Sequence, residues 1–383
     1  MLYFDHSAST PPYEEVIETM MQVMKKHYAN PSSLHAGGVE AAGLIQRSRA
    51  LIAEQMKTTK GSWLFTSGGT ESNNLAIKGV AKQYRSRGNH IIATSIEHAS
   101  VHETLKQLEA EGYLVTYVPV SSSGHVQVKH IQAAITKDTI LVTVMHVNNE
   151  IGTIQPIQEI GEMLKEYPKT IFHVDAVQSM GKLRLDPDGW GIDLVSGSAH
   201  KLRGPRGIGF LYVREGVKLY PLSSGGTHEL GFRAGTENVP AIVAAAKALR
   251  LSVEGSVQRK NRMELLSKQL RSFIQSKQEL KLNGAEPLAP NIIHFSYPGM
   301  KPEVIVHMLE QNGIIASTKS ACSSKDNKPS RVLLALGASE KHASGGVRIS
   351  LGDEHEQKHM NELSLALTRI IEQLKPLERS STY

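Results

Sequence analysis

Short apolar runs alternate with longer amphipathic stretches over roughly the first 250 residues. Runs rich in β-branched and aromatic residues predict strands, and they occur at 63–66, 90–94, 115–118, 140–147, 171–174, 194–196 and 209–213. Helical patterns lie between several of them, for example at 101–111 and 157–166. Continuous apolar strands that alternate with helices indicate an α/β fold, in which a mainly parallel sheet is covered on both faces.

The pattern changes after about residue 250. A long charged amphipathic helix is predicted at 258–280, a strand at 291–295, a helix at 304–312 and another strand at 347–351. Apolar residues then recur at three- and four-residue spacing, which predicts a closing helix, at Met360, Leu363, Leu367, Ile370 and Leu374. Fewer and longer units indicate a second, smaller α+β domain. We expect a large domain over 15–250 and a small domain formed by 1–14 and 251–383.

Composition excludes several classes of protein. The chain has 383 residues, of which 40% are hydrophobic and 21% charged, as in soluble globular proteins of two or three domains. The longest nearly apolar run, 140–147, is too short to cross a bilayer. The first ten residues show no signal-peptide pattern. We expect a cytoplasmic protein without a membrane segment.

Charge adds little to this picture. Lys and Arg number 43 against 37 Asp and Glu, which gives a net charge of +6. So mild an excess favours solubility over a role in binding RNA or an acidic protein. The basic residues are scattered and do not interleave with aromatic residues, so we expect no direct contact with nucleic acid.

The single cysteine, Cys322, restricts the chemistry. It excludes an internal disulfide and a multi-thiolate metal site within one chain, and a free thiol fits a reducing compartment. His98 and His102 have a spacing that could bind a metal on one helix face. No third ligand lies nearby, which favours ordinary helix histidines, and we expect no metal.

The run FTSGGTESNN at 65–74 passes from a strand through small residues into a helix. Glycines let the backbone approach an anion, and the start of a helix offers free N–H groups and a positive dipole end. This pattern favours a phosphate site, although an ordinary capped helix after a tight turn would fit as well. The run has neither Gly-Lys-Ser/Thr nor Gly-x-Gly-x-x-Gly, which disfavours a nucleoside-triphosphate loop.

Two residues at strand ends extend this interpretation. Asp175 ends an apolar strand, where ligands gather in open α/β sheets. A buried carboxylate must be paired, either with a protonated ring nitrogen of a cofactor or with a nearby Lys or Arg. Lys201 directly follows another strand among small residues, a setting that suits a Schiff base. A phosphate turn, a strand-end aspartate and such a lysine are the three anchors that pyridoxal 5'-phosphate requires.

Cys322 lies in SACSSKDNKP at 320–329, a polar segment without periodicity that predicts a loop. The neighbouring Lys319 and Lys325 favour partial ionisation of the thiol, and the thiolate is the nucleophilic form. A chemically inert cysteine in a hydrophobic core is the alternative.

Taken together, these segments resemble the pyridoxal-phosphate-dependent cysteine desulfurases, NifS/IscS-like members of the class V aminotransferase family. The family's motifs occur in order between Tyr3 and about Gly352, as FTSGGTESNN, IEHAS, MHVNNEIG, HVDAVQS, SGSAHKLRGPRG, RAGTEN, SAC and VRISLG. The resemblance implies a fold-type I pyridoxal-phosphate transferase. Its large domain has a mainly parallel seven-stranded sheet, and its smaller domain is α+β.

The resemblance also implies a role for each site residue. Lys201 holds the cofactor through its amine, Asp175 pairs with the pyridinium nitrogen, and His98 stacks on the ring and moves protons. Contacts to the ring substituents come from Asn149 and Gln178. The phosphate is bound by Gly69, Thr70, Ser198, His200 and, across a homodimer interface, Thr236. The substrate carboxylate is bound by Arg348 as a bidentate guanidinium, together with Asn149.

The implied reaction converts L-cysteine to L-alanine and leaves a persulfide on Cys322, with Lys201 and His98 as the other catalytic residues. The segment 317–333 resembles the family branch with an extended catalytic loop, which hands its persulfide directly to acceptor proteins. The acceptor would be a tRNA-thiolating enzyme, an iron–sulfur scaffold or a component of thiamine synthesis. The charged loop and a shortened C-terminus favour a dedicated acceptor over a housekeeping scaffold.

Two alternatives remain open at this stage. One is a pyridoxal-phosphate-dependent selenocysteine lyase or aminotransferase that does not use Cys322, and the other is a non-enzymatic cofactor-binding scaffold. The chain also departs from the family at two places. Leu230 replaces a common Arg or Lys near the dimer-contact loop, and 325–328 is more charged than usual, which suggests an acceptor surface.

Overall fold

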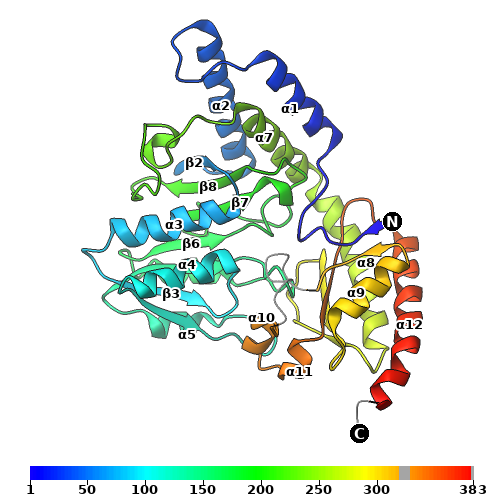
Figure 1. The fold of residues 1–383 in the computed structure, drawn as a ribbon. Coiled ribbons are helices and arrows are strands. Elements are labelled where there is room, and N and C mark those ends of the chain that lie inside the picture. Colours follow the sequence, from blue (N-terminus) through cyan, green and yellow to red (C-terminus); the bar gives the residue numbers. More distant parts are fainter. Residues whose placement is uncertain (319–327, 381–383) are drawn as a thin grey trace.

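The computed structural model describes residues 1–318 and 328–380, and within them seven strands form one central sheet (Figure 1). Their spatial order is β2 (Gly61–Thr66), β8 (Gly209–Arg214), β7 (Leu194–Ser198), β6 (Ile171–Asp175), β5 (Thr139–Met145), β3 (His90–Thr94) and β4 (Leu114–Val118). Only β8 runs antiparallel to its neighbours; the other adjacent pairs are parallel. The predicted mainly parallel seven-stranded sheet is therefore confirmed, and each predicted strand overlaps an observed one.

Helices cover both faces of this sheet. One face packs against α1 (Glu14–Lys26), α2 (Ala36–Gln55), α5 (Val128–Ala134), α6 (Ile157–Leu164) and α7 (Val239–Glu254). The other face packs against α3 (Gly69–Gln83) and α4 (Ala99–Ala110). Every residue of β3, β5, β6 and β7 is buried, which is why these strands read as continuous apolar runs.

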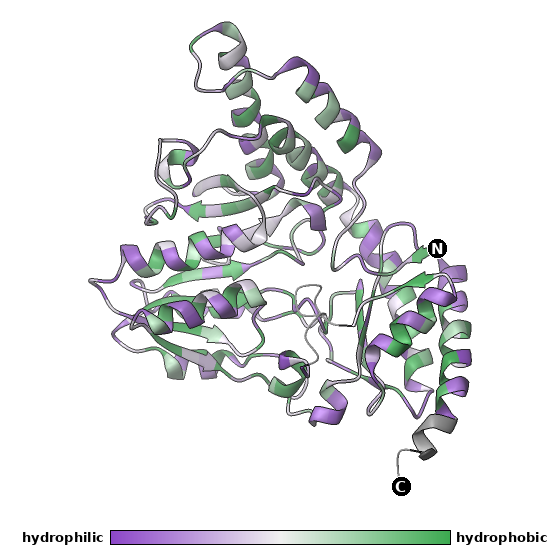
Figure 2. Ribbon diagram, in the orientation of Figure 1, coloured by the Kyte–Doolittle hydropathy of each residue, from purple (hydrophilic) through white to green (hydrophobic). Residues whose placement is uncertain are grey.

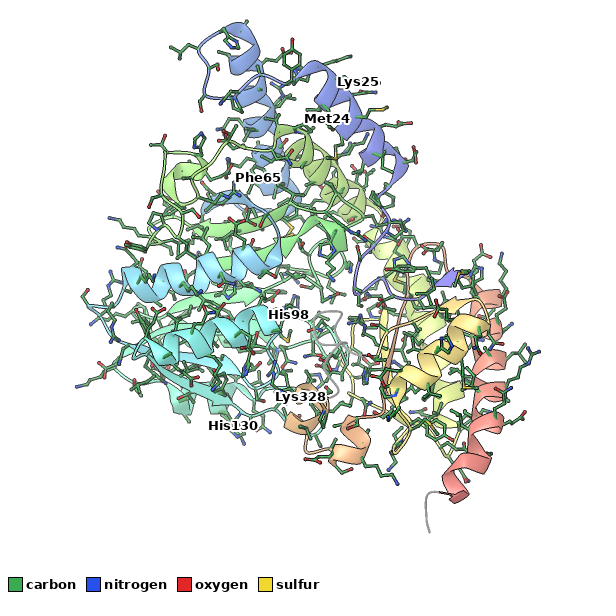
Figure 3. All side chains as sticks on the ribbon, viewed as in Figure 1. Met24, Lys25, Phe65, His98, His130 and Lys328 are labelled. Atoms are coloured by element: carbon green, nitrogen blue, oxygen red, sulfur yellow. The ribbon has the colours of Figure 1, made fainter. Side chains whose placement is uncertain are left out.

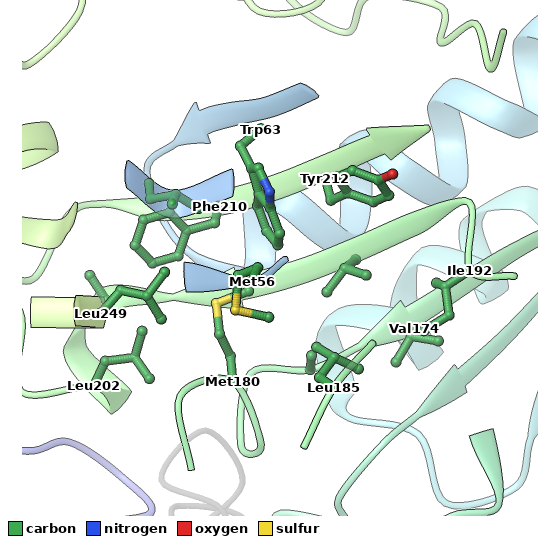
Figure 4. Close-up of a cluster of buried hydrophobic side chains, with 14 of the residues drawn as sticks. Met56, Trp63, Val174, Met180, Leu185, Ile192, Leu202, Phe210, Tyr212 and Leu249 are labelled. Atoms are coloured by element: carbon green, nitrogen blue, oxygen red, sulfur yellow. The ribbon is translucent and has the colours of Figure 1, made fainter. Parts of the chain in front are cut away.

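The core on the first face contains the largest side chains of the sheet. Figure 4 shows Trp63 of β2 beside Tyr212 and Phe210 of β8, with Met180 and Leu249 packed beneath them. Figure 2 shows the same trend across the molecule, because apolar residues follow the strands and the inner sides of the helices. This close-packed sheet is the rigid base on which the site is built.

A second core lies beside the sheet. A three-stranded antiparallel sheet has the order β12 (Gly346–Ser350), β10 (Ile292–Ser296) and β9 (Lys281–Leu282). It packs with α8 (Ser256–Gln275), α9 (Pro302–Gln311) and α12 (Gln357–Ser380). Phe4 belongs to this core, and β1 (Leu2–Tyr3) pairs in parallel with β11 (Ile314–Ile315). The exact division at residues 15 and 250 stays a prediction.

The predicted catalytic loop, about 317–333, is described only at its two ends and stays a prediction. Ser317 forms a bridge with Arg348, and the end of the predicted 317–333 segment enters α10 (Arg331–Ala335), which α11 (Glu340–Ala343) follows. The helix starts early because the Ser330 side chain caps it by accepting from Leu333 N, and Val332 is buried. Cys322 lies outside the described residues. Over those residues, every helix is too short or too polar to span a lipid bilayer.

Candidate functional site

The site is a cavity at the carboxyl edge of β5, β6 and β7 that opens to solvent, with about 710 Å³ of empty space when its open mouth is included. Its lining includes every predicted cofactor or substrate residue except Thr236: Gly69, Thr70, His98, Asn149, Asp175, Gln178, Ser198, His200, Lys201 and Arg348. Figure 3 shows His98 on the side of the large sheet that faces the smaller core. These residues are up to 279 positions apart in the sequence, and the fold brings them to one place.

Asp175 ends β6 and is 5% exposed. Its Oδ2 accepts a hydrogen bond from Asn73 Nδ2 at 2.8 Å, and its Oδ1 accepts from Val177 N at 3.0 Å. Among the described residues no Lys or Arg forms an ion pair with it. Of the two pairings open from sequence, an ion pair with Lys or Arg is therefore not formed within the described residues, which leaves the carboxylate available to a cationic group of a ligand.

His98 is the N-cap of α4 and is connected to Asp175. Its Nδ1 accepts from Ser100 N at 3.1 Å, and Ser100 Oγ accepts from Asn73 Nδ2 at 2.9 Å. Burial is the main cause that lowers the pKa of His98, so the ring is neutral near pH 7. With Nδ1 accepting, the proton is assigned to Nε2. A neutral aromatic ring is thus fixed at the cavity wall.

Lys201 ends η1 (Ala199–Lys201), the short turn after β7. Its Nζ donates to the carbonyl oxygens of Ser7 and, at 2.7 Å, of Ala8. The amide of Gln178 donates to the same Ser7 carbonyl at 3.0 Å. The N-terminal segment therefore holds the lysine amine in the cavity.

Gly69, Thr70, Ser198 and His200 form a site suited to an anion at the start of α3, called the anion cradle below. A Cβ at Gly69 would come within 2.7 Å of a Val177 methyl, so glycine is needed for this approach. Thr70, Ser198 and His200 surround the helix start, whose N–H groups favour a phosphate. Burial, followed by the charge of Lys201, lowers the pKa of His200 to about 4, so it is a neutral hydrogen-bonding partner.

Arg348 closes the opposite side of the cavity and is 1% exposed. Its Nη2 pairs with Asp5 Oδ1 at 2.8 Å, and its Nη1 donates to Asn149 O at 2.8 Å. Asp5 compensates the buried charge and fixes the plane of the guanidinium. The Nε of Arg348 has no hydrogen-bond partner among the described residues, which leaves it for a carboxylate.

Several buried polar atoms around this cavity lack partners within the described chain. They are the side-chain oxygens of Ser7, Asn73, Gln178 and Ser198, together with Arg348 Nε. Because buried polar atoms are nearly always hydrogen-bonded, this concentration points to a polar ligand. A phosphorylated aromatic ring with a cationic nitrogen would satisfy all three features of the site. Its phosphate would bind the anion cradle, its ring would contact His98, and its nitrogen would pair with Asp175. The residues fit pyridoxal 5'-phosphate.

Sequence reasoning missed the residues that support this site. Asn73 and Ser100 connect Asp175 with His98, Asp5 holds Arg348, and Ser7 binds Lys201 and Gln178. Asn73 and Asp5 lie in the runs FTSGGTESNN and YFDHSAST, but no hydrophobic period marks them. Arg206 lines the space beside the anion cradle and was missed as well.

Other predicted residues lie elsewhere. Thr236 is exposed and does not line the cavity. His98 and His102 form no metal-ligand group with a third residue in the described chain. Leu230 is 57% exposed in the short helix η2 (Glu229–Gly231).

Comparison with known proteins gives a consistent result. Residues 2–363 match the family model Aminotransferase class-V. The chain is 41% identical over 380 residues to "Cysteine desulfurase IscS" of Clostridium botulinum, covering 98% of this chain and 96% of that protein. It resembles the solved structure "NIFS-LIKE PROTEIN" with a TM-score of 0.90 and 36% identity, over 98% of this chain and 99% of the other. It is also similar to "SspA in complex with cysteine", at TM-score 0.81 and 36% identity, over 92% and 99% of the two chains.

Proposed function

The chain belongs to the class V aminotransferase family, among its cysteine desulfurases, and from this premise we propose that it converts L-cysteine to L-alanine with pyridoxal 5'-phosphate bound in the cavity. The observation that carries the assignment is the convergence of the cofactor and substrate residues on one cavity. Bound there, pyridoxal 5'-phosphate would supply an electron sink for charge that develops at the substrate Cα. The remaining chemistry falls to side chains of this chain.

The residues at the ends of β6 and β7 and at the starts of α3 and α4 would hold the cofactor. Asp175 would accept a hydrogen bond from the protonated ring nitrogen, and His98, kept neutral by burial, would contact the ring. The anion cradle at the start of α3, with Ser198 and His200, binds the phosphate. Lys201 attaches the cofactor through its amine and, once released, takes the Cα proton and returns it.

Arg348 orients the substrate. Its guanidinium is buried at the cavity and is held in one plane by Asp5, so it binds the carboxylate of L-cysteine in a fixed direction. Asn149 lies beside it, since its carbonyl accepts from Arg348 Nη1. Fixing the carboxylate also fixes the direction of the substrate sulfur, and Ser317, which bridges Arg348, leads into the segment that contains Cys322.

Sulfur transfer uses Cys322 as the acceptor. Its thiolate attacks the substrate sulfur, a sulfur–sulfur bond forms, and the Cβ–sulfur bond breaks with its electron pair remaining on the carbon side. Protonation there completes L-alanine, and Cys322 retains a persulfide. The persulfide then passes to a sulfur-acceptor protein, a tRNA-thiolating enzyme or an iron–sulfur scaffold. A free thiol suits the cytoplasm, where it stays reduced.

The active unit in this proposal is a homodimer. Ile17, Met21, Met24 and Tyr28 leave apolar side chains exposed on and just after α1. The connection from α1 to α2 contacts the segment that leads to Thr236, because Ser32 Oγ lies 3.3 Å from His228 Nε2. A second copy seated on this surface would cover the apolar patch and bring Thr236 to the partner's phosphate. Sedimentation of Met24→Glu should show a monomer if this is the interface.

Replacement of Cys322 tests the reaction. In Cys322→Ala we expect cofactor absorbance to remain and to shift when L-cysteine is added, while alanine formation is lost. A selenocysteine lyase or aminotransferase that ignores the thiol would keep its turnover, which would contradict the proposal. For the acceptor, Cys322 labelled with radioactive sulfur should transfer label to one purified candidate in preference to the others. Equal labelling of all candidates would remove the case for a dedicated acceptor.

A further inference from the structure

A group of metal-ligating side chains lies outside the cavity. His6, Glu354 and His355 each offer one ligand atom, and these atoms all lie within 4.8 Å of one another. His6 is 2% exposed and His355 is 1% exposed, whereas the Glu354 side chain is 44% exposed. The two histidine rings meet edge to face, with centroids 5.6 Å apart and an interplanar angle of 84°. Two buried imidazoles and a carboxylate from distant parts of the chain thus meet at one point.

His355 leaves one nitrogen without a partner. Its Nδ1 lies 2.7 Å from Gly352 N and 3.3 Å from Gly352 O. Its Nε2 is buried and has no hydrogen-bond partner among the described residues. A buried imidazole nitrogen in this state is costly unless a ligand satisfies it. Because Gly352 N donates to Nδ1, the ring proton is assigned to Nε2. Binding a metal at Nε2 therefore requires the other tautomer, whose Nδ1–H would donate to Gly352 O, 3.3 Å away, as metal-bound histidines commonly do with a backbone carbonyl.

We propose that His6, Glu354 and His355 bind a divalent transition metal, Zn²⁺, with water in the fourth position. Two imidazoles and one carboxylate match the ligands that zinc prefers. Bonds of about 2.0–2.2 Å require ligand atoms somewhat over 3 Å apart. His6 Nε2 and Glu354 Oε1 are now 2.5 Å apart, in a hydrogen bond that the metal would replace. Glu354 Oε2 accepts from Arg203 Nη1 at 3.1 Å, so Oε1 is the oxygen offered to the metal. Because the Glu354 side chain is 44% exposed, it has room to move away from His6 by the distance required.

The position of this site gives it a structural consequence. His6 lies between Asp5, which pairs with Arg348, and Ser7, whose carbonyl accepts from Lys201. Glu354 and His355 follow β12 in the smaller core. A metal here would connect the N-terminal segment to the segment after β12, the strand that contains Arg348. The metal would lie outside the cavity.

The test uses the holoenzyme with Cys322→Ser, because a thiolate would bind zinc on its own. After removal of metal with a chelator, we expect one Zn²⁺ per chain in competition with a chromophoric chelator, and a higher melting temperature with zinc. Glu354→Gln and His355→Ala should each weaken zinc binding by at least about tenfold. Glu354→Gln keeps the size of this partly exposed side chain. If the metal-free variant melts at the same temperature as the metal-free parent, weaker zinc binding in it reports on the ligand.

His359→Ala is the matched control. This histidine contacts the ring of His355, with centroids 5.9 Å apart, but its Nδ1 accepts from Glu356 N at 3.0 Å. We expect the control to bind zinc like the parent. Absence of stoichiometric zinc from the parent, or equal affinity in the parent, Glu354→Gln and His355→Ala, would overturn the assignment.

Discussion

Two walls enclose the cavity, and they are built in different ways. The sheet wall consists of residues at the ends of β5, β6 and β7 and at the starts of α3 and α4, where each side chain is carried by an element that ends at the site. The junction consists of residues 5–8, 317–318, 328–331 and 348–355, where segments from both ends of the chain touch. The sheet wall is fixed by the main core, while the junction depends on a few polar contacts.

This difference separates two tasks. The sheet wall presents Asp175, His98 and the anion cradle, which are the groups that would hold a cofactor. The junction presents Arg348 and anchors both sides of the segment that contains Cys322, which are the groups that would handle the substrate and its sulfur. Changes in the sheet wall should therefore affect the chemical step, and changes in the junction should affect substrate binding and sulfur transfer.

The largest expected effect comes from Lys201→Ala. Lys201 is held by both regions, since it follows β7 and donates to Ser7 and Ala8. Loss of its amine removes both covalent attachment and proton transfer, so alanine formation should fall by about 10²–10⁴-fold or more. The absorbance of the lysine-bound cofactor should disappear as well. Lys165→Ala, at an exposed ion pair with Glu162, is the control and should retain both; near-normal turnover in Lys201→Ala would refute its role.

The next effect isolates the junction. Asp5→Asn removes the charge that compensates buried Arg348, so the guanidinium loses its fixed plane and an ion-pair partner. We expect KM for L-cysteine to rise by about tenfold or more, with a smaller change in kcat, since one charge-assisted contact is weakened. Steady-state alanine formation measures both constants. Asp353→Asn is a matched control because Asp353 pairs with Arg203 and Arg259 in the same region. A fall in kcat at unchanged KM would assign Asp5 to the chemical step instead.

The sheet wall could be predicted from the sequence better than the junction could. The strands of the sheet wall were predicted closely because burial on both faces makes them continuous apolar runs, and Asp175 and Lys201 were found because they follow such runs. Asn73 and Ser100 were not found, since a polar residue inside a helix has no period of its own. Asp5 and Arg348 are 343 residues apart, and His6 and Glu354 are 348 apart. No local pattern connects such pairs.

Acid stability tests how two buried histidines, one beside the sheet wall and one in the small sheet, affect the free energy of unfolding. Burial lowers the pKa of His146, beside the sheet wall, to about 4, and that of His294, in the small sheet, to about 3. Below about pH 6.5 each of these histidines binds a proton in the unfolded chain but stays neutral in the folded chain. Stability present above that pH is therefore lost as pH falls, by about 1.4 kcal/mol per pH unit for each residue.

His146→Gln and His294→Gln should each flatten this acid decline between pH 6.5 and 4. Urea unfolding at a series of pH values measures it, and His307→Gln, at an exposed position, should leave the slope unchanged. If the decline in unfolding free energy is reduced equally in the two variants, the two histidines are buried to the same energetic effect. The sheet wall and the junction would then differ in how their segments are connected and not in burial. A slope unaffected by either variant would contradict the burial argument.

The smallest effect concerns the point where the junction meets the sheet wall after Cys322. Ser330 Oγ donates to Glu150 Oε2 at 2.6 Å and accepts from Leu333 N as the cap of α10, whereas Ser339 only caps α11. Losing a cap costs about 1 kcal/mol, so Ser339→Ala should lower the unfolding free energy by about that amount. Ser330→Ala should cost about 1 kcal/mol more, because the buried Glu150 carboxylate also loses its hydrogen bond.

If Ser330 anchors the end of the catalytic segment, Ser330→Ala should also slow persulfide formation on Cys322. The cofactor's absorbance response to L-cysteine should be unchanged in that variant, and Ser339→Ala should not slow persulfide formation. Equal stability losses and equal persulfide rates in the two variants would reduce Ser330 to an ordinary helix cap.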